Sequence, residues 1–291
     1  MTAPAIRPMT LADIDPASVA LVDSGFGDRR TWFEFAVTHP ACRPVVAELG
    51  GEIVGTGVGT ANGAAGWIAT IWVAPAHRGA GLGRALTEVV IGDLGATGCR
   101  TFILVATEQG QRLYEHMGFT VHTNYRILEA PNAVMEAPFT PGAPAPPPPG
   151  EADPAIRPFA DGDLGPILAM DRQATGEDRS HAIRLFASPE TTTVLEVAGE
   201  LRGFVVRASW GGGATIAPDA SDALRILAAR RRAGSASGRV RVGLLEENRA
   251  GIELLVGQGY RHAWAAPRLI RGAALDWRPA WIWGQLNLAL G

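Results

Sequence analysis

Residues 73–86 read Val-Ala-Pro-Ala-His-Arg-Gly-Ala-Gly-Leu-Gly-Arg-Ala-Leu, and this stretch decides the fold of the first half of the chain. The preceding residues 67–73 (WIATIWV) are rich in β-branched and aromatic side chains, which predicts a strand. Downstream, apolar residues at 82, 85, 86, 89, 90 and 94 have the spacing of one helical face, which predicts a helix over 81–97. A strand is therefore expected to lead through a glycine-rich loop into a helix.

The loop between this strand and this helix has the chemistry of an anion site. Gly79, Gly81 and Gly83 permit unusual φ angles and close approach of a ligand. The first turn of the following helix offers unpaired N–H groups and the positive end of the helix dipole. Arg78 and Arg84 add positive charge, so the expected ligand is a pyrophosphate.

Two common phosphate-binding motifs are excluded. A Walker A loop needs Gly-Lys followed by Ser or Thr, whereas Gly83 is followed by Arg84 and Ala85, which disfavours ATP. A dinucleotide motif that begins at Gly79 would need glycine at position 84, and residues 101–107 contain no acid to hold a ribose. NAD and FAD are therefore disfavoured too.

The rest of the first half predicts a mixed α/β domain. Residues 43–49 and 52–60 read as a hairpin of strands, and residues 101–107 (TFILVAT) form a continuous apolar run of strand length. Residues 109–117 then read as a short helix that ends at Gly118, a suitable C-cap.

At these residues the chain resembles the GNAT superfamily of acyl-CoA-dependent N-acetyltransferases. Arg78, Gly81 and Gly83 match the family loop [Q/R]-x-x-G-x-[G/A], which holds the coenzyme A pyrophosphate. A second family signature, N-x-x-A-x-x-L-Y followed by G-F, is matched in part at Thr107, Gly110, Leu113, Tyr114, Gly118 and Phe119.

The resemblance implies an acetyl-CoA site and no metal. It implies that Tyr114 acts as a general acid toward the departing thiolate, or hydrogen-bonds it. It also implies that the end of the strand pairs its backbone with the pantetheine arm. The cofactor-binding residues expected on this basis are Trp72, Val73, Arg78, Gly79, Ala80, Gly81, Leu82, Gly83, Arg84, Thr107 and Gly110.

The function implied is N-acetyl transfer from acetyl-CoA to a primary amine, by direct attack in a ternary complex. Many family members carry a glutamate base on the strand that here reads Ala-Thr-Ile-Trp over 69–72, and this strand has no acid. The residue that acts as general base is therefore not identified, and Glu108, Glu115 and His116 are the candidates nearby in sequence. Two alternatives stay open: an acyl-CoA sensor without activity, and a transferase with a longer acyl donor or a non-amine acceptor.

The two halves of the chain share three motifs in the same order, which predicts a duplicated domain. Each motif in the first half has a similar sequence at the corresponding position in the second half. The pairs are Ile6-Arg7-Pro8 with Ile156-Arg157-Pro158, residues 51–55 with 199–203, and residues 110–119 with 251–260.

The second copy is expected to have lost its cofactor site. Leu255 stands where Tyr114 stands in the first copy, and residues 217–222 (APDASD) replace the glycine loop. Asp219 and Asp222 would repel a pyrophosphate. Four tryptophans in the last 28 residues are expected to wall the acceptor cleft or to pack in a core: Trp264, Trp277, Trp281 and Trp283. The run Arg230–Arg232 is expected to form a solvated helix end.

Composition completes the prediction. Two tandem GNAT-like domains, 1–136 and 155–291, are expected to be joined by a Pro-rich linker over 137–154. A net charge of −3 disfavours nucleic acid, and the absence of a secretory signal or an 18-residue apolar run predicts a cytoplasmic protein off the membrane. Cys42 and Cys99 are expected to be reduced. The partner is a small-molecule amine, whose identity, like the oligomeric state, is open.

Overall fold

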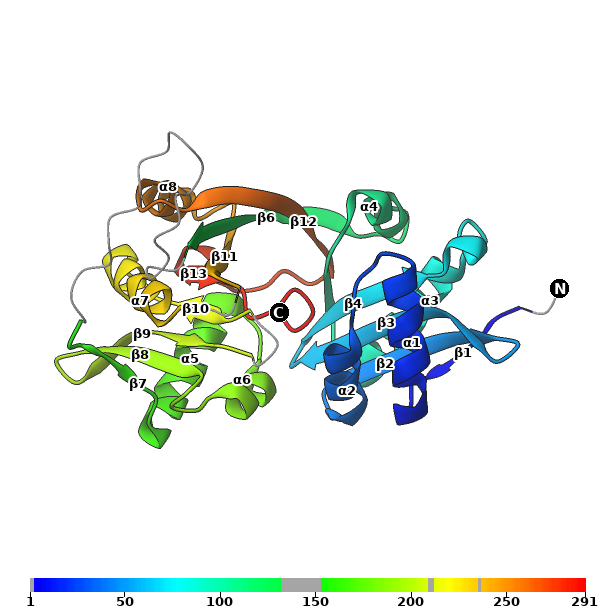
Figure 1. Ribbon diagram of the computed structural model, residues 1–291, viewed down its shortest axis with the longest axis horizontal. Coiled ribbons are helices and arrows are strands. Elements are labelled where there is room, and N and C mark those ends of the chain that lie inside the picture. Colours follow the sequence, from blue (N-terminus) through cyan, green and yellow to red (C-terminus); the bar gives the residue numbers. More distant parts are fainter. Residues whose placement is uncertain (1–2, 132–152, 209–211, 235–236) are drawn as a thin grey trace. The chain divides into compact units, whose positions relative to one another are not determined.

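The computed structural model describes residues 3–131, 153–208, 212–234 and 237–291. Helices and strands alternate in the order of a mixed α/β protein (Figure 1). They are β1 Ala5–Pro8, η1 Leu11–Asp13, α1 Ile14–Asp23, α2 Arg30–Thr38, β2 Cys42–Leu49, β3 Glu52–Asn62, β4 Ala65–Val73, η2 Pro75–His77, α3 Leu82–Ala96, β5 Thr101–Val105, α4 Glu108–Glu115, β6 Thr120–Pro131, β7 Ile156–Pro158, η3 Asp161–Asp163, α5 Leu164–Thr175, α6 Ser180–Phe186, β8 Thr192–Val197, β9 Glu200–Val206, β10 Ala214–Ile216, α7 Ala220–Ala233, β11 Arg239–Leu245, α8 Arg249–Gly257, β12 Arg261–Gly272, η4 Pro279–Trp281 and β13 Ile282–Gly284.

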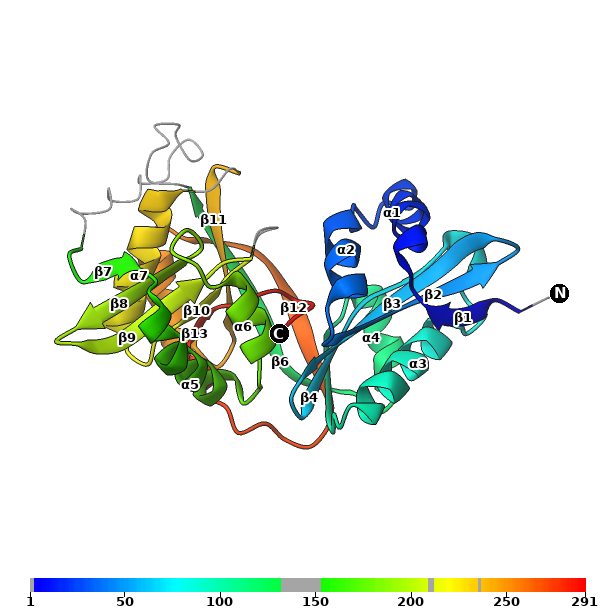
Figure 2. The same cartoon turned by 90° about the horizontal axis from the view of Figure 1, so that it is seen from below.

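The chain divides into two compact units, and the strands and helices predicted for the first half are confirmed. Unit 1 comprises Met1–Thr120, Leu269–Ala274 and Leu288–Gly291, and unit 2 comprises Val121–Arg268 and Leu275–Asn287. In unit 1, β1, β2, β3 and β4 form an antiparallel sheet, and β5 pairs parallel with β4. Figure 2 shows α1 and α2 on one face of this sheet and α3 on the other.

Glycines in β3 let α3 pack close to the sheet. A Cβ at Gly55 would lie 2.8 Å from Leu86 Cδ1, and a Cβ at Gly59 would lie 2.9 Å from Leu94 Cγ. Larger side chains at these positions would push the helix away. The core therefore fixes the distance between α3 and the sheet, and with it the place of the glycine loop.

Each sequence half gives part of a strand to the unit that the other half builds: β6 from Val121 onward lies in unit 2, and the end of β12 from Leu269 onward lies in unit 1. β6 pairs antiparallel with β11 in unit 2, from Tyr125 opposite Leu245 to Pro131 opposite Arg239. In turn, β12 neighbours β5, Leu269 lies in the core of unit 1, and Thr101 Oγ1 donates to the carbonyl of Ala273 at 2.8 Å. The compact units thus differ from the ranges 1–136 and 155–291 by these exchanged strand segments and by Leu288–Gly291, which belongs to unit 1.

The Pro-rich segment predicted over 137–154 lies outside the described residues, except for Asp153 and Pro154. The described residues on either side both belong to unit 2 and both contact α7. Arg231 Nε donates to the carbonyl of Pro131 at 3.3 Å, and Arg225 Nε lies 2.6 Å from Asp153 Oδ2. The segment between them therefore joins two points of one unit.

The internal repeat is visible in side-chain geometry. Arg7 bonds Asp13 at 2.8 Å and Glu48 at 3.0 Å in the first half. In the second half the equivalent arginine makes the same two bonds, at 2.7 and 2.9 Å: Arg157 with Asp163 and Glu196. Hydrogen bonds from these arginines hold the pKa of both aspartates below the usual range.

One prediction about the surface is wrong. Arg231 was expected in a solvated helix end but is only 5% exposed, because its guanidinium lies 5.5 Å from the centre of the Tyr260 ring and donates to the carbonyl of Gln258.

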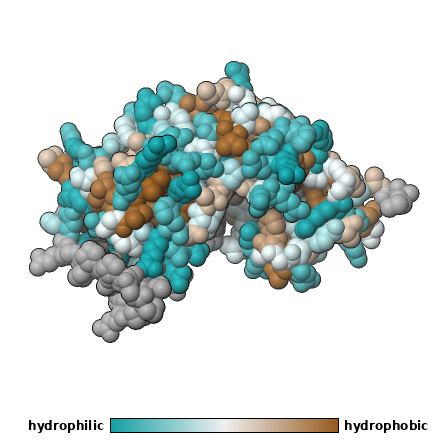
Figure 3. All heavy atoms as spheres, turned by 90° about the horizontal axis from the view of Figure 1, so that it is seen from above, coloured by the Kyte–Doolittle hydropathy of each residue, from teal (hydrophilic) through white to brown (hydrophobic). Residues whose placement is uncertain are grey.

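On the face drawn in Figure 3, hydrophobic residues form small groups between hydrophilic ones. No helix within the described ranges is long and apolar enough to cross a membrane.

Candidate functional site

Strands β4 and β5 separate after a short stretch of pairing. Their parallel register runs from Ala65 opposite Thr101 to Trp67 opposite Ile103. Beyond it, up to Val73, β4 pairs with β3 alone among the described strands. Backbone N–H and C=O groups on the other edge of β4 are therefore open to an added strand or an extended ligand.

The glycine loop leads from the end of β4 into α3 as predicted. Gly79 has a φ of 81° and Gly81 has a φ of 83°, left-handed values that side chains rarely tolerate. Gly81 is the N-cap of α3, and no side chain caps this helix. The first N–H groups of α3 thus point from an uncapped helix N-terminus, where an anion is favoured.

The two arginines of the loop are held in different ways. Arg78 is exposed, and its Nε donates to the carbonyl of Val73 at 3.0 Å, which fixes the guanidinium against the end of β4. Arg84 turns toward α4, because its Nη2 donates to the carbonyl of His116 at 3.2 Å. Arg84 Nη1 also lies 3.6 Å from Glu88 Oε1, and this carboxylate offsets part of the positive charge of Arg84.

The other loop residues predicted to bind the cofactor divide by exposure. The Leu82 side chain belongs to the core, and Trp72 is buried with its indole N–H donating to Ser24 Oγ at 2.8 Å. These two residues can offer only backbone groups. Ala80 is exposed, and a Cβ at Gly83 would lie 3.7 Å from Val73 and 3.5 Å from Leu113.

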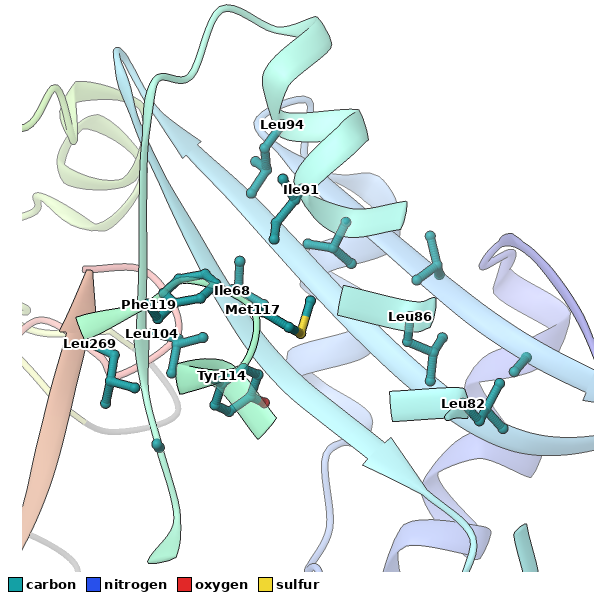
Figure 4. Packing of buried hydrophobic residues seen from close by; sticks show 14 of the residues in the cluster. Ile68, Leu82, Leu86, Ile91, Leu94, Leu104, Tyr114, Met117, Phe119 and Leu269 are labelled. Atoms are coloured by element: carbon teal, nitrogen blue, oxygen red, sulfur yellow. The ribbon is translucent and has the colours of Figure 1, made fainter. Parts of the chain in front are cut away.

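Tyr114 lies on α4 in the core that also contains Leu82 and Leu86 of α3 (Figure 4). Its ring packs edge-on against Phe119 with 6.0 Å between the ring centres. Burial raises the pKa of Tyr114 to about 12. Across the described ranges, no residue hydrogen-bonds its hydroxyl, so the phenol keeps a donor for a ligand.

Thr107 and Gly110, predicted as cofactor ligands, hold the helix that carries Tyr114. Thr107 is the N-cap of α4, and its Oγ1 accepts from the N–H of Gly110 at 3.1 Å. A Cβ at Gly110 would lie 3.2 Å from Tyr114 Cε2. In unit 2, Asn248 caps α8 in the same way, accepting from the N–H of Gly251 at 3.0 Å.

The equivalent helix N-terminus in the second half is filled. Asp219 caps α7 by accepting from the N–H of Ser221 at 2.8 Å. Asp222 is buried, and its carboxylate lies 3.1 Å from Arg202 and 3.3 Å from Arg225. The chain thus supplies its own anions where unit 1 leaves the helix uncapped.

The strand edge in the second half is filled as well, which the sequence did not indicate. β13 pairs antiparallel with β10, which follows β9 as β4 follows β3 (Figure 1). Trp283 of β13 is buried and donates to the carbonyl of Ala217 at 3.2 Å. This tryptophan serves the core, whereas Trp277 stacks on His122 and Trp264 is 47% exposed.

The sequence also did not reveal Thr70, which forms a bulge in β4. Thr56 on β3 pairs with Trp72 and Val58 pairs with Ala69, so the register between β3 and β4 shifts at Gly57. Two residues of β4 therefore lie opposite Gly57. Thr70 has a φ of 54°. No composition or spacing signal marks a left-handed threonine, so only the structure finds it.

A mixed sheet whose parallel strands separate beside an uncapped helix N-terminus is the arrangement that the GNAT resemblance predicts for the first half. Residues 12–119 match the family described as "Acetyltransferase (GNAT) family". The first half of the chain therefore carries a domain of the GNAT acetyltransferase family.

Solved structures share the fold over nearly the whole chain. A proposed acetyltransferase from Pyrococcus horikoshii is 20% identical with a TM-score of 0.79, covering 100% of this chain and 97% of that one. A GCN5-related N-acetyltransferase from Sphaerobacter thermophilus is 17% identical with a TM-score of 0.63, at 94% and 98% coverage. A tandem GNAT protein from the clavulanic acid biosynthesis pathway is 13% identical with a TM-score of 0.59, at 93% and 99% coverage.

These similarities confirm the predicted fold class, a mixed α/β chain with tandem GNAT-like halves. No curated protein matches the chain in sequence. Within the part of the chain that the structure describes, no group of three or more His, Cys, Asp or Glu side chains is placed to hold a metal ion.

Proposed function

We propose that unit 1 transfers an acetyl group from acetyl-CoA to a primary amine in a ternary complex. The observation that carries the proposal is the contrast between two equivalent places. In unit 1 the helix N-terminus lacks a side-chain cap and the strand edge is open, whereas in the second half Asp219, Asp222 and β13 fill both. Membership of the first half in an acetyltransferase family supports the same assignment.

The residues around the glycine loop would hold the donor. The N–H groups of Leu82 and Gly83 and the guanidinium of Arg78 are suited to a pyrophosphate, because they combine a helix N-terminus with a fixed cation. The backbone of Val73 faces the open edge and would pair with an amide of pantetheine, as an added strand does, whereas the backbone of Trp72 faces β3 opposite Thr56.

Tyr114 would act at the leaving group. The amine nitrogen attacks the thioester carbonyl carbon, the carbon–sulfur bond breaks, and the sulfur leaves with the electron pair. The Tyr114 hydroxyl, which has no hydrogen bond to any described residue, would donate to this sulfur. The amine attacks in its neutral form. Because β4 has no carboxylate, the proton that the nitrogen then loses would pass to solvent.

The roles of the two halves follow from the same contrast. We place catalysis in residues 1–136, and we assign residues 155–291 a structural or acceptor-cleft role. The chain would then bind a single coenzyme A, act in the cytoplasm and take a small-molecule amine.

The test is release of free thiol by the full chain. Acetyl-, propionyl- and succinyl-CoA are each incubated with kanamycin, spermidine, phenylalaninamide or an alanine-initiated peptide, and thiol is measured with a chromogenic reagent. We expect acetyl-CoA to be the best donor and one amine to stimulate release. The double variant Arg78→Ala, Gly81→Glu should lose activity, whereas Ser221→Glu, in the first turn of α7, should keep it.

Each other outcome has a defined meaning. Coenzyme binding without thiol release from any mixture would identify a sensor, and faster release from a longer acyl donor would change the donor. Undiminished coenzyme binding by the double variant would move the site away from the glycine loop.

A further inference from the structure

The bulge in β4 places a hydroxyl on the sheet face that α1 and α2 cover. Ile68 packs in the core beneath α3, and Ile71 also faces α3, since its Cδ1 would lie 2.9 Å from a Cβ at Gly57 beside Val90. In a regular strand, alternation would put residue 70 on the face of Ile68. The bulge therefore makes Thr70 the extra residue and shifts it to the opposite face.

The conformation of Thr70 is held by its surroundings. A φ of 54° is an outlier for a β-branched residue, and such backbone strain is on the order of 1–3 kcal/mol. The buried Thr56 donates from Oγ1 to the carbonyl of Thr70 at 2.9 Å. The backbone is thus fixed from the sheet side, because strained residues persist only where neighbours determine them.

The hydroxyl of Thr70 is fixed from the helix side. Trp32 of α2 donates from its indole Nε1 to Thr70 Oγ1 at 3.0 Å, and Trp32 is only 7% exposed. An indole only donates, so Thr70 keeps its own O–H and one lone pair. No other described residue hydrogen-bonds this oxygen, and Thr70 itself is only half-buried.

We propose that the Thr70 hydroxyl contacts the acceptor amine and that Trp32 is the positioning residue that aims it. The inference rests on the proposed function, and it identifies the residue that orients the attacking amine. Thr70 lies on the strand whose open edge would carry the thioester, on the face lined by the helices of residues 14–38. Its free lone pair accepts an N–H of the amine, which orients the nitrogen lone pair toward the carbonyl carbon.

Matched variants test this arrangement with the best acceptor from the thiol-release panel. Thr70→Ala and Thr70→Ser both remove the β-branch, and they differ only by the hydroxyl. We expect Thr70→Ala to lower kcat/KM for the amine about five- to tenfold, the size of one neutral hydrogen bond. Thr70→Ser should stay within about twofold of the wild type. The KM for acetyl-CoA should not change in either variant.

A double-variant cycle separates positioning from folding. Trp32→Phe should lower kcat/KM for the amine in the wild-type background but add nothing in the Thr70→Ala background, because its effect passes through the hydroxyl. Ser24→Ala, which removes the partner of Trp72 on the same face, is the control and should leave the amine kinetics unchanged.

Two failures are distinguishable. If the wild type acetylates an amine and Thr70→Ala does so equally well, the role of Thr70 is refuted and the proposed function stands. If the wild type releases no thiol with any amine while it binds coenzyme A, the proposed function fails, and the acceptor role of Thr70 fails with it. Additive losses in the double variant would refute the positioning role of Trp32 alone.

Discussion

Replacing Tyr114 by phenylalanine separates proton transfer from hydrogen bonding at the leaving thiolate. Burial raises the pKa of Tyr114 to about 12, whereas a free thiol has a pKa of about 8.5. Complete transfer of the proton would be uphill by roughly 3.5 units, or about 4.8 kcal/mol. Tyr114 should therefore act mainly by donating a hydrogen bond to the developing thiolate.

The loss of activity in Tyr114→Phe should have the size of one hydrogen bond to a charged group. A hydrogen bond to a charged group contributes about 1.5–3 kcal/mol, so kcat of Tyr114→Phe should fall about 10- to 150-fold. Because no described residue bonds the hydroxyl, the melting temperature should not change, and the dissociation constant of coenzyme A should stay within about twofold. The deficit should be constant from pH 7 to about pH 10, since the phenol stays protonated throughout this range.

The assay is steady-state thiol release at saturating acetyl-CoA and amine, together with calorimetric binding of coenzyme A. A change in kcat below twofold would remove Tyr114 from the leaving group. A loss of about 10³- to 10⁴-fold with an intact fold would show full proton transfer, and it would contradict the role of burial described above.

Three further predictions concern the scaffold. Thr107→Ala should lower the free energy of unfolding by about 1 kcal/mol, whereas Thr107→Asn, which introduces the cap of the second half, should not; chemical denaturation measures both. Replacing residues 132–152 by about ten Gly and Ser residues should leave the melting temperature and the activity unchanged. The reason is that Pro131 and Asp153 contact Arg231 and Arg225 of α7, which are six residues or ~9 Å apart along the helix. Loss of the fold in this variant would contradict the connection. Stability should fall as the pH rises from about 9 to about 12, because the folded chain holds the protons of four buried groups more tightly than the unfolded chain does: Cys42, Tyr114, Tyr125 and Tyr260. Tyrosinate absorbance and the melting temperature measure this loss.

The sequence predicts the local elements of unit 1 well because their signals are local. The apolar face of α3, the run of β5 and the glycine at position 118 each depend on neighbouring residues. The repeated Arg7 and Arg157 motifs also identify the duplication. These features need no knowledge of distant contacts.

The features that the sequence does not predict arise from long-range pairing. β6 pairs with β11 more than 100 residues away, and nothing in residues 120–131 indicates which sheet they join. The pairing of β13 with β10 is equally non-local. The burial of Arg231 depends on Tyr260, in the loop between α8 and β12, so a run of arginines reads as solvated until that partner is known.

The candidate site divides in the same way. The glycine loop and Tyr114 follow from short motifs, whereas the bulge at Thr70 depends on β3, α2 and the sheet together. A structural role for Thr107 and Gly110, as the cap of α4, likewise needs the geometry of the helix.

The most direct test of the account is the stoichiometry of coenzyme A binding, measured by isothermal titration calorimetry on the full chain. We predict one coenzyme A per chain, because Asp219, Asp222 and β13 fill the equivalent place in the second half. Binding should be lost in Gly81→Glu and unchanged in Ser221→Glu. Two coenzyme A per chain, or a single one that Ser221→Glu abolishes, would contradict it.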